Sequence, residues 1–115
     1  MLKNSFFLAC LLGLLCATQI GCDKSAPVSL YFDETGCSNP WDSYYEADSF
    51  SLAALEQSIY RMLQDYQIQD ATVRFDFDST KIQLCLACHC TTGRIVVVHT
   101  TQANRLALRR LDFYP

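Results

Sequence analysis

The first 21 residues place the strongest constraint on this chain, because their pattern predicts that they are removed before the domain folds. Lys3 gives the segment a positively charged start, and residues 6–17 (FFLACLLGLLCA) form a short apolar run. This is the layout of a secretory signal peptide. The run is too short for a transmembrane helix, which needs about 20 apolar residues. The rest of the chain is therefore expected to fold outside the cytoplasm.

The residues that follow predict a lipid anchor. The sequence Gln19-Ile20-Gly21-Cys22 resembles the lipobox of bacterial lipoproteins, although Gln19 stands where Leu is usual. In such signals the cysteine is lipidated and becomes the mature N-terminus. We expect a signal peptide over residues 1–21, a lipid on Cys22, and an anchor and linker over residues 22–27. More than one acyl chain would hold the protein firmly on a membrane, either facing the periplasm or at the cell surface.

Residues 28–115 are expected to form one domain with a modest core, in a size range where covalent cross-links help. The full chain has a net charge of −3, and loss of Lys3 would make it more acidic. Nucleic-acid binding requires a basic surface that neutralises phosphates, so we do not expect it. Arg105, Arg109 and Arg110 are expected on the solvated face of a C-terminal helix.

Three segments are predicted strands because they are rich in β-branched and aromatic residues: 28–32, 71–78 and 94–99. Residues 81–86 are expected to continue the sheet as a further strand after a turn at residues 78–80. Among the strands at 28–32, 71–78, 81–86 and 94–99, two carry a clear pattern. In the second of these, Val73, Phe75 and Phe77 alternate with polar residues, which is typical of a half-buried strand in an antiparallel sheet. The last contains four consecutive β-branched residues and should be the central strand. Asp76 and Asp78 fall on the polar side of that alternation, which favours a solvated face over a calcium or glycosidase site.

Two helices are predicted. Ser49 or Ser51 caps the first, which carries an apolar stripe at three- and four-residue spacing: Leu52, Leu55, Ile59, Met62 and Tyr66. Thr100 or Thr101 caps the second, which ends near Arg110. The expected order is β-α-β-β-β-α. The sequence therefore predicts an α+β fold, a small antiparallel sheet with two helices on one face.

Four cysteines remain in the domain: Cys37, Cys85, Cys88 and Cys90. An even number in a small exported domain favours two disulfides. Linking Cys37 to the cluster would leave two cluster cysteines to pair. A Cys88–Cys90 bond is disfavoured, because alternate side chains stand about 6.5–7 Å apart along a strand. A Cys85–Cys88 bond is feasible if the strand bends, and the sequence leaves the connectivity open.

The same cysteines permit two other interpretations. Four thiolates, or three with His89 as a possible extra ligand, could bind zinc or copper(I). His89 is a weaker fourth ligand than Cys37, because it points away from Cys88 and Cys90 in a regular strand. Alternatively, Cys85-x-x-Cys88 could be a thiol-disulfide redox pair. Redox enzymes place that motif at a helix N-terminus, whereas here it follows a predicted strand.

No catalytic motif stands out. The sequence has no Gly-x-Ser-x-Gly elbow, no HExxH and no phosphate-binding loop. We therefore expect a non-enzymatic protein without a cofactor. Trp41, Tyr44 and Tyr45 are expected to cover a sheet edge and close the core, and a binding surface is the alternative.

Two segments carry a resemblance: Cys-Ser-Asn-Pro-Trp at residues 37–41 and Cys-Leu-Ala-Cys-His-Cys-Thr-Thr-Gly-Arg at residues 85–94. Together with the predicted anchor, they resemble small uncharacterised envelope lipoproteins of the Bacteroidota, which carry a similar Cys-x-Cys followed by a Thr-Gly-Arg turn. The resemblance implies a lipoprotein of the cell envelope. It implies no activity, and the sequence leaves any protein or small-molecule partner unknown.

Overall fold

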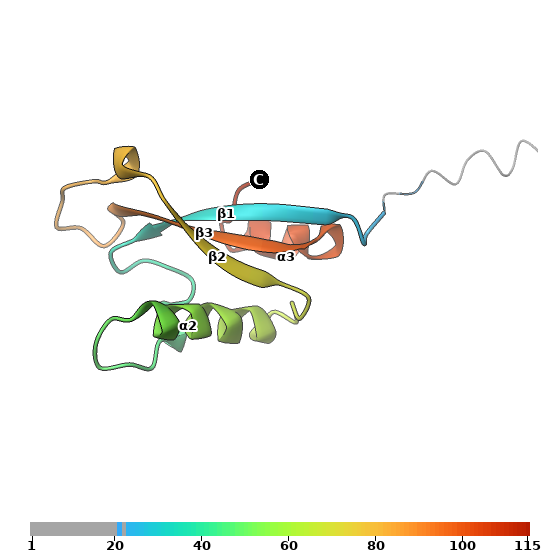
Figure 1. The fold of residues 1–115 in the computed structure, drawn as a ribbon, viewed down its shortest axis with the longest axis horizontal. Helices are drawn as coiled ribbons and strands as arrows, with labels where there is room; N and C mark the ends of the chain where they lie inside the picture. The colour runs from blue at the N-terminus through green and yellow to red at the C-terminus, as the bar shows by residue number, and fades with distance from the viewer. Residues whose placement is uncertain (1–20, 22) are drawn as a thin grey trace, which may run out of the picture.

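A computed structural model describes Gly21 and residues 23–115, and residues 1–20 of the predicted signal peptide and the predicted lipidation site Cys22 lie outside these residues. The elements are strands β1 (Pro27–Thr35), β2 (Thr72–Phe77) and β3 (Thr91–Thr101), and helices α2 (Leu52–Asp65) and α3 (Arg105–Arg110). Three short 3-10 helices connect them: η1 (Asp42–Tyr44), η2 (Ser79–Lys81) and η3 (Gln102–Asn104). The predicted α+β class is confirmed (Figure 1).

The strands form one antiparallel sheet in the order β1-β3-β2. Its register places Leu30 and Val73 on either side of Val98. The predicted central position of the β-branched strand is confirmed, since β3 has a partner on both sides. Antiparallel pairing with one covered face agrees with the alternation at Val73 and Phe75, which pack against the core. Phe77, expected on the same side, is 67% exposed.

The predicted strand over residues 81–86 is wrong. The Asp78 side chain accepts a hydrogen bond from the N–H of Thr80 at 2.9 Å and begins η2 instead of a hairpin. Residues 82–90 then form an irregular loop. A strand paired with β3 by a short turn would need the edge of β3 that β2 already occupies. β-propensity alone does not create a free edge.

Helix α2 forms much as the pattern predicts. The Ser51 side chain accepts a hydrogen bond from the N–H of Ala54 at 3.1 Å, so Ser51 and not Ser49 is the N-cap. The middle of the stripe is buried, but its ends are not, since Leu52 is 51% exposed and Tyr66 is 49% exposed. The second helix is shorter than expected: β3 continues through Thr101, and α3 has no side-chain cap.

The core lies between one face of the sheet and both helices. It combines residues from β1 and β3, from α2, from α3 and from the connecting segments: Leu30, Trp41, Leu55, Ile59, Met62, Leu63, Ile68, Val96, Val98, Leu108 and Phe113. Val73 and Phe75 of β2 pack against this core and are partly buried. Because Leu108 of α3 belongs to the same cluster as the α2 stripe, both helices cover the same face, as predicted. Trp41 closes this core at 1% exposure, the structural role expected of it.

At both outer edges of the sheet, some of the backbone hydrogen-bonding groups have partners. At β1, the backbone of Tyr114 exchanges two hydrogen bonds with Tyr31, at 2.7 and 2.8 Å, and extends the sheet by one bridge. At β2, the Tyr60 hydroxyl of α2 accepts a hydrogen bond from the N–H of Val73 at 3.0 Å. Covered edges reduce the tendency of a sheet to pair with other chains.

Candidate functional site: a disulfide-stapled loop

Two disulfides gather the four cysteines at one end of the sheet. Cys37, in the loop after β1, is bonded to Cys88, and Cys85 is bonded to Cys90. The expected link from Cys37 to the cluster is confirmed. The second pair is Cys85–Cys90, so Cys85 and Cys88 are not bonded to each other. We call residues 82–90 the stapled loop.

Backbone hydrogen bonds reinforce the longer disulfide. The N–H of Cys37 donates to the carbonyl of Cys88 at 3.1 Å, and the N–H of Gly36 donates to the carbonyl of Cys90 at 3.1 Å. These bonds run beside the Cys37–Cys88 link, whose Cα atoms are 4.5 Å apart. The loop after β1 and the stapled loop are therefore joined by two backbone hydrogen bonds as well as by the disulfide, and not at a single covalent point.

An ion pair fixes the base of the stapled loop to the open face of the sheet. The Lys81 ammonium donates to both Asp33 oxygens, at 3.0 and 3.1 Å, and to the Tyr114 hydroxyl at 3.0 Å. The Tyr114 hydroxyl in turn donates to Asp33 at 2.8 Å. The bonds to Tyr114 and then to Asp33 raise the pKa of Lys81 above its ordinary value. The Thr91 hydroxyl also donates to the Lys81 carbonyl.

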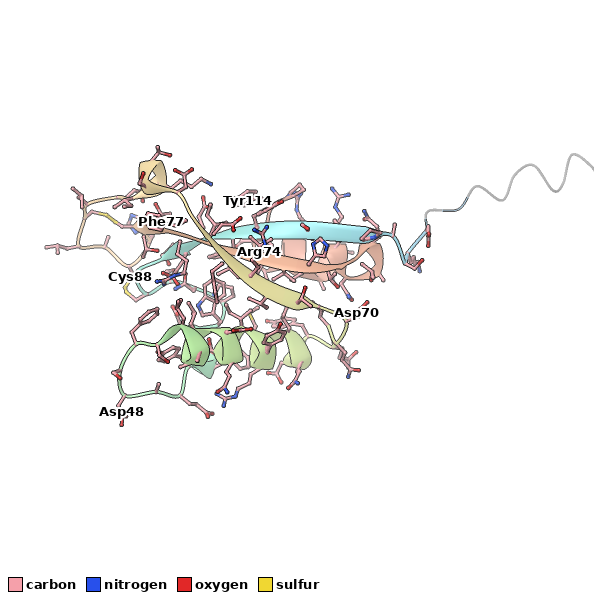
Figure 2. All side chains as sticks on the ribbon, viewed as in Figure 1. Asp48, Asp70, Arg74, Phe77, Cys88 and Tyr114 are labelled. Atoms are coloured by element: carbon pink, nitrogen blue, oxygen red, sulfur yellow. A yellow bond between two sulfur atoms is a disulfide. The ribbon has the colours of Figure 1, made fainter. Side chains whose placement is uncertain are left out.

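The stapled loop displays apolar side chains. Leu84 and Leu86 are 98% and 107% exposed, and Ile82 at its base is 42% exposed. The loop contains no Asp, Glu, Lys or Arg. Figure 2 shows Cys88 and Phe77 at this end of the molecule, with Asp70 at the other end. Leu84 and Leu86 are therefore held in solvent on a cross-linked, uncharged loop.

The structure does not favour a metal centre at the cysteines. His89 is exposed, and all four cysteines are in disulfides, whereas zinc and copper(I) bind thiolates. Within residues 23–115, no group of three or more His, Cys, Asp or Glu side chains is arranged to hold a metal ion. The redox interpretation also loses its pair, because Cys85 and Cys88 belong to different disulfides in an irregular loop.

A cavity of about 310 Å³ lies beside the stapled loop, between the end of β1, the start of α2 and the loop that joins them. Glu34 lines it and is 7% exposed. Its carboxylate accepts hydrogen bonds from Arg94 at 2.8 and 2.9 Å and from the Thr92 hydroxyl at 2.8 Å. The Arg94 guanidinium also lies over the Phe50 ring, 4.9 Å from its centroid. The carboxylate is thus neutralised by its own partners.

Sequence patterns gave no sign of this ion pair. Glu34 lies near the end of β1 and Arg94 near the start of β3, and only the pairing of these two strands brings them together. The exposed leucines were also missed, because residues 81–86 were expected in a strand.

The helices of residues 23–115 include none long and apolar enough to span a membrane. Comparison with protein-family models, curated proteins and solved structures finds no match. Functional conclusions about this domain therefore depend on its own geometry and on the N-terminal sequence.

Proposed function

We propose that this protein is a lipid-anchored, non-enzymatic domain of the bacterial cell envelope that presents the stapled loop to another protein. The observation that carries the proposal is the pair of disulfides holding Leu84 and Leu86 in solvent. Disulfides persist in oxidising compartments outside the cytoplasm. The N-terminal sequence independently predicts export and lipidation at Cys22.

The position of the loop supports presentation away from the anchor. In the antiparallel register, Pro27 pairs with Thr101 at one end of the sheet and Thr35 pairs with Thr91 at the other. Nine residues of strand span about 30 Å. The stapled loop follows from the Thr91 end, whereas the N-terminal segment reaches the domain at the Pro27 end (Figure 1). A membrane tether at Cys22 would leave the leucines facing outward.

The cross-links support recognition by a pre-formed surface. Binding by an ordered loop avoids much of the entropic cost of ordering it on association. Two leucines also offer apolar area that a protein groove can bury, at about 25 cal/mol per Å². An uncharged tip has no ionic groups to desolvate when it enters such a groove.

Two experiments test this proposal. The first is the mass of the protein isolated from bacterial membranes, in which a Cys22→Ala variant should lack the acyl mass found on the wild type. The second places a photo-crosslinking residue at position 84 or, as a control, at the exposed position 52. We expect a discrete protein adduct from position 84 alone, lost when Leu86→Ser is added. Absence of acylation, or the same adducts from both positions, would contradict the proposal.

A further inference from the structure

We propose that the end of the domain next to the N-terminal segment docks on the headgroups of an acidic phospholipid bilayer and orients the domain on it. This inference rests on the proposed lipid anchor at Cys22. The surface consists of Lys24, Arg105, Leu106 and Arg109, which we call the basic end.

The residues expected to be a linker are in fact bound to the domain. The carbonyl of Lys24 accepts a hydrogen bond from the N–H of Ala103 at 3.0 Å, and the carbonyl of Ala26 accepts one from Gln102 at 2.9 Å. Only Asp23 separates Lys24 from Cys22. Two residues of extended chain reach about 7 Å. A lipid on Cys22 would therefore bring this end of the domain to the membrane surface.

The unpaired cations of the described chain gather near this end and along α3. Among the eight basic residues of the described chain, four form ion pairs with carboxylates: Arg61 with Glu46, Arg74 with Asp76, Lys81 with Asp33, and Arg94 with Glu34. The remaining four form no ion pair with the described residues: Lys24, Arg105, Arg109 and Arg110. All four are exposed. Unpaired surface cations are the groups that acidic lipid headgroups attract.

The basic end combines cationic and apolar side chains, as a surface that binds lipid headgroups requires. Lys24 and Arg105 line one hollow, and Arg105, Leu106 and Arg109 line the next. Leu106 is 62% exposed between the two arginines. Asp23 is the one acidic residue that lines these hollows, and its carboxylate already accepts hydrogen bonds from Ser25. Asp70 also lies at this end, where the side chains of Thr101 and Asn104 donate hydrogen bonds to its carboxylate. Three cations therefore stand against two carboxylates here, within a protein of net charge −3.

The docked orientation follows from the sheet. The basic end lies beside the Pro27–Thr101 pair, and the stapled loop lies beyond the Thr35–Thr91 pair. Contacts at the basic end would orient the domain so that its strands point away from the membrane surface. Leu84 and Leu86 would then be fixed at a distance from the bilayer instead of sweeping across it.

The test uses the acylated full-length product, reconstituted in vesicles that carry a spin-labelled headgroup. Leu106→Trp reports on the basic end, and Leu84→Trp is the matched reporter on the stapled loop, since both leucines are exposed. We expect quenching of the added tryptophan at position 106, on phosphatidylglycerol but not on phosphatidylcholine vesicles, and none at position 84. Arg105→Glu with Arg109→Glu should lower the docked-to-free ratio by about fivefold per arginine, and high salt should lower it as well.

A control variant, Arg61→Glu with Arg74→Glu, reverses two charges elsewhere and should leave the quenching unchanged. Quenching at position 84, or equal quenching at both positions, would overturn the inference. Absence of quenching at position 106 in a protein whose mass includes the acyl chains would overturn the docking and leave the anchor intact. Absence of the acyl mass itself would overturn the proposed function, and the docking with it.

Discussion

Cys37 and Cys88 are separated by 51 residues in the chain and are bonded to each other at the end of the sheet. The bond joins the loop after β1 to the stapled loop, so two irregular segments form one surface. The smaller Cys85–Cys90 ring, with a separation of 5 residues, shapes the tip itself. One disulfide thus positions the loop and the other sets its local conformation.

The two disulfides should contribute unequally to stability. In the chain-entropy model, closing a ring of 51 residues is worth about 4 kcal/mol and closing one of 5 residues about 2 kcal/mol. Cys37→Ser with Cys88→Ser should therefore lower the free energy of unfolding more than Cys85→Ser with Cys90→Ser. Urea denaturation of both double variants measures the difference. Equal losses would show that the longer cross-link does not act through the unfolded chain.

Gly93 should tolerate no side chain. Its φ is +91°, and an added Cβ would lie 2.8 Å from Cγ1 of Ile82 and 2.9 Å from Cε2 of Phe77. Gly93→Ala should cost about 1–3 kcal/mol through backbone strain and crowding. Gly36→Ala is the control, because its nearest neighbour would be the Cys88 carbonyl at 3.7 Å. Thermal unfolding should separate the two variants, and equal midpoints would contradict the strain at Gly93.

Removing one member of the Glu34–Arg94 pair should destabilise the fold. Glu34 is nearly buried, whereas the Arg94 side chain is 27% exposed. We expect Arg94→Met to cost about 2–3 kcal/mol, since it leaves a buried carboxylate without its cation. Adding Glu34→Met should restore much of the loss. Chemical denaturation measures the stability of both variants. A double variant no more stable than Arg94→Met would mean that Arg94 does not stabilise the fold through its ion pair with Glu34.

Acid should weaken the contact between Asp70, two residues before β2, and Asn104 of η3. Hydrogen bonds, first from Asn104 and also from Thr101, hold the pKa of Asp70 below its ordinary 3.8. A carboxyl with a lowered pKa stabilises the fold above its unfolded-state pKa, and that stabilisation is lost as the pH falls through the lowered value. Unfolding followed from about pH 6 to about pH 2 should show a larger acid loss for the wild type than for Asp70→Asn. Parallel curves for the two proteins would refute this linkage.

The leucines of the stapled loop should serve binding and not folding. Leu84→Ser with Leu86→Ser removes apolar side chains that are already in solvent, so stability should change by less than about 0.5 kcal/mol. The same pair of substitutions should abolish the adduct formed from the loop, with a crosslinker moved to position 83. Leu55→Ser, in the core at 3% exposure, is the contrasting variant and should destabilise strongly. A large loss of stability from the loop variant would mean that the two leucines pack against the domain in solution.

Periodic elements were predictable from the sequence because their patterns report burial directly. The stripe of α2 and the β-branched run of β3 each have one stable placement, against the core and at the centre of the sheet. Residues 81–86 were expected in a strand, but they contain one β-branched residue, and β3 has no free edge for them. Propensity is local, whereas strand pairing is a property of the whole sheet.

The site was predictable only in part. An exported chain with four domain cysteines indicated cross-links, but their connectivity depends on where β1 and β3 place Cys37 and Cys88. The Glu34–Arg94 pair depends on the same register. The exposure of Leu84 and Leu86 follows from the loop that the Cys85–Cys90 bond closes. In each case the contact joins two residues whose local sequence does not predict that they meet.

The most direct test of the account is disulfide mapping of the mature protein by mass spectrometry without reduction. The account predicts a domain lighter by four hydrogens than its reduced form, with Cys37 linked to Cys88 and Cys85 linked to Cys90. Cleavage after Lys81 and Arg94 leaves Cys85, Cys88 and Cys90 in one peptide, residues 82–94. Fragmentation that cleaves sulfur–sulfur bonds then assigns which of these cysteines is linked to Cys37. Four alkylatable thiols in the denatured protein, or a Cys85–Cys88 link, would contradict the account and return the cysteines to metal or redox chemistry.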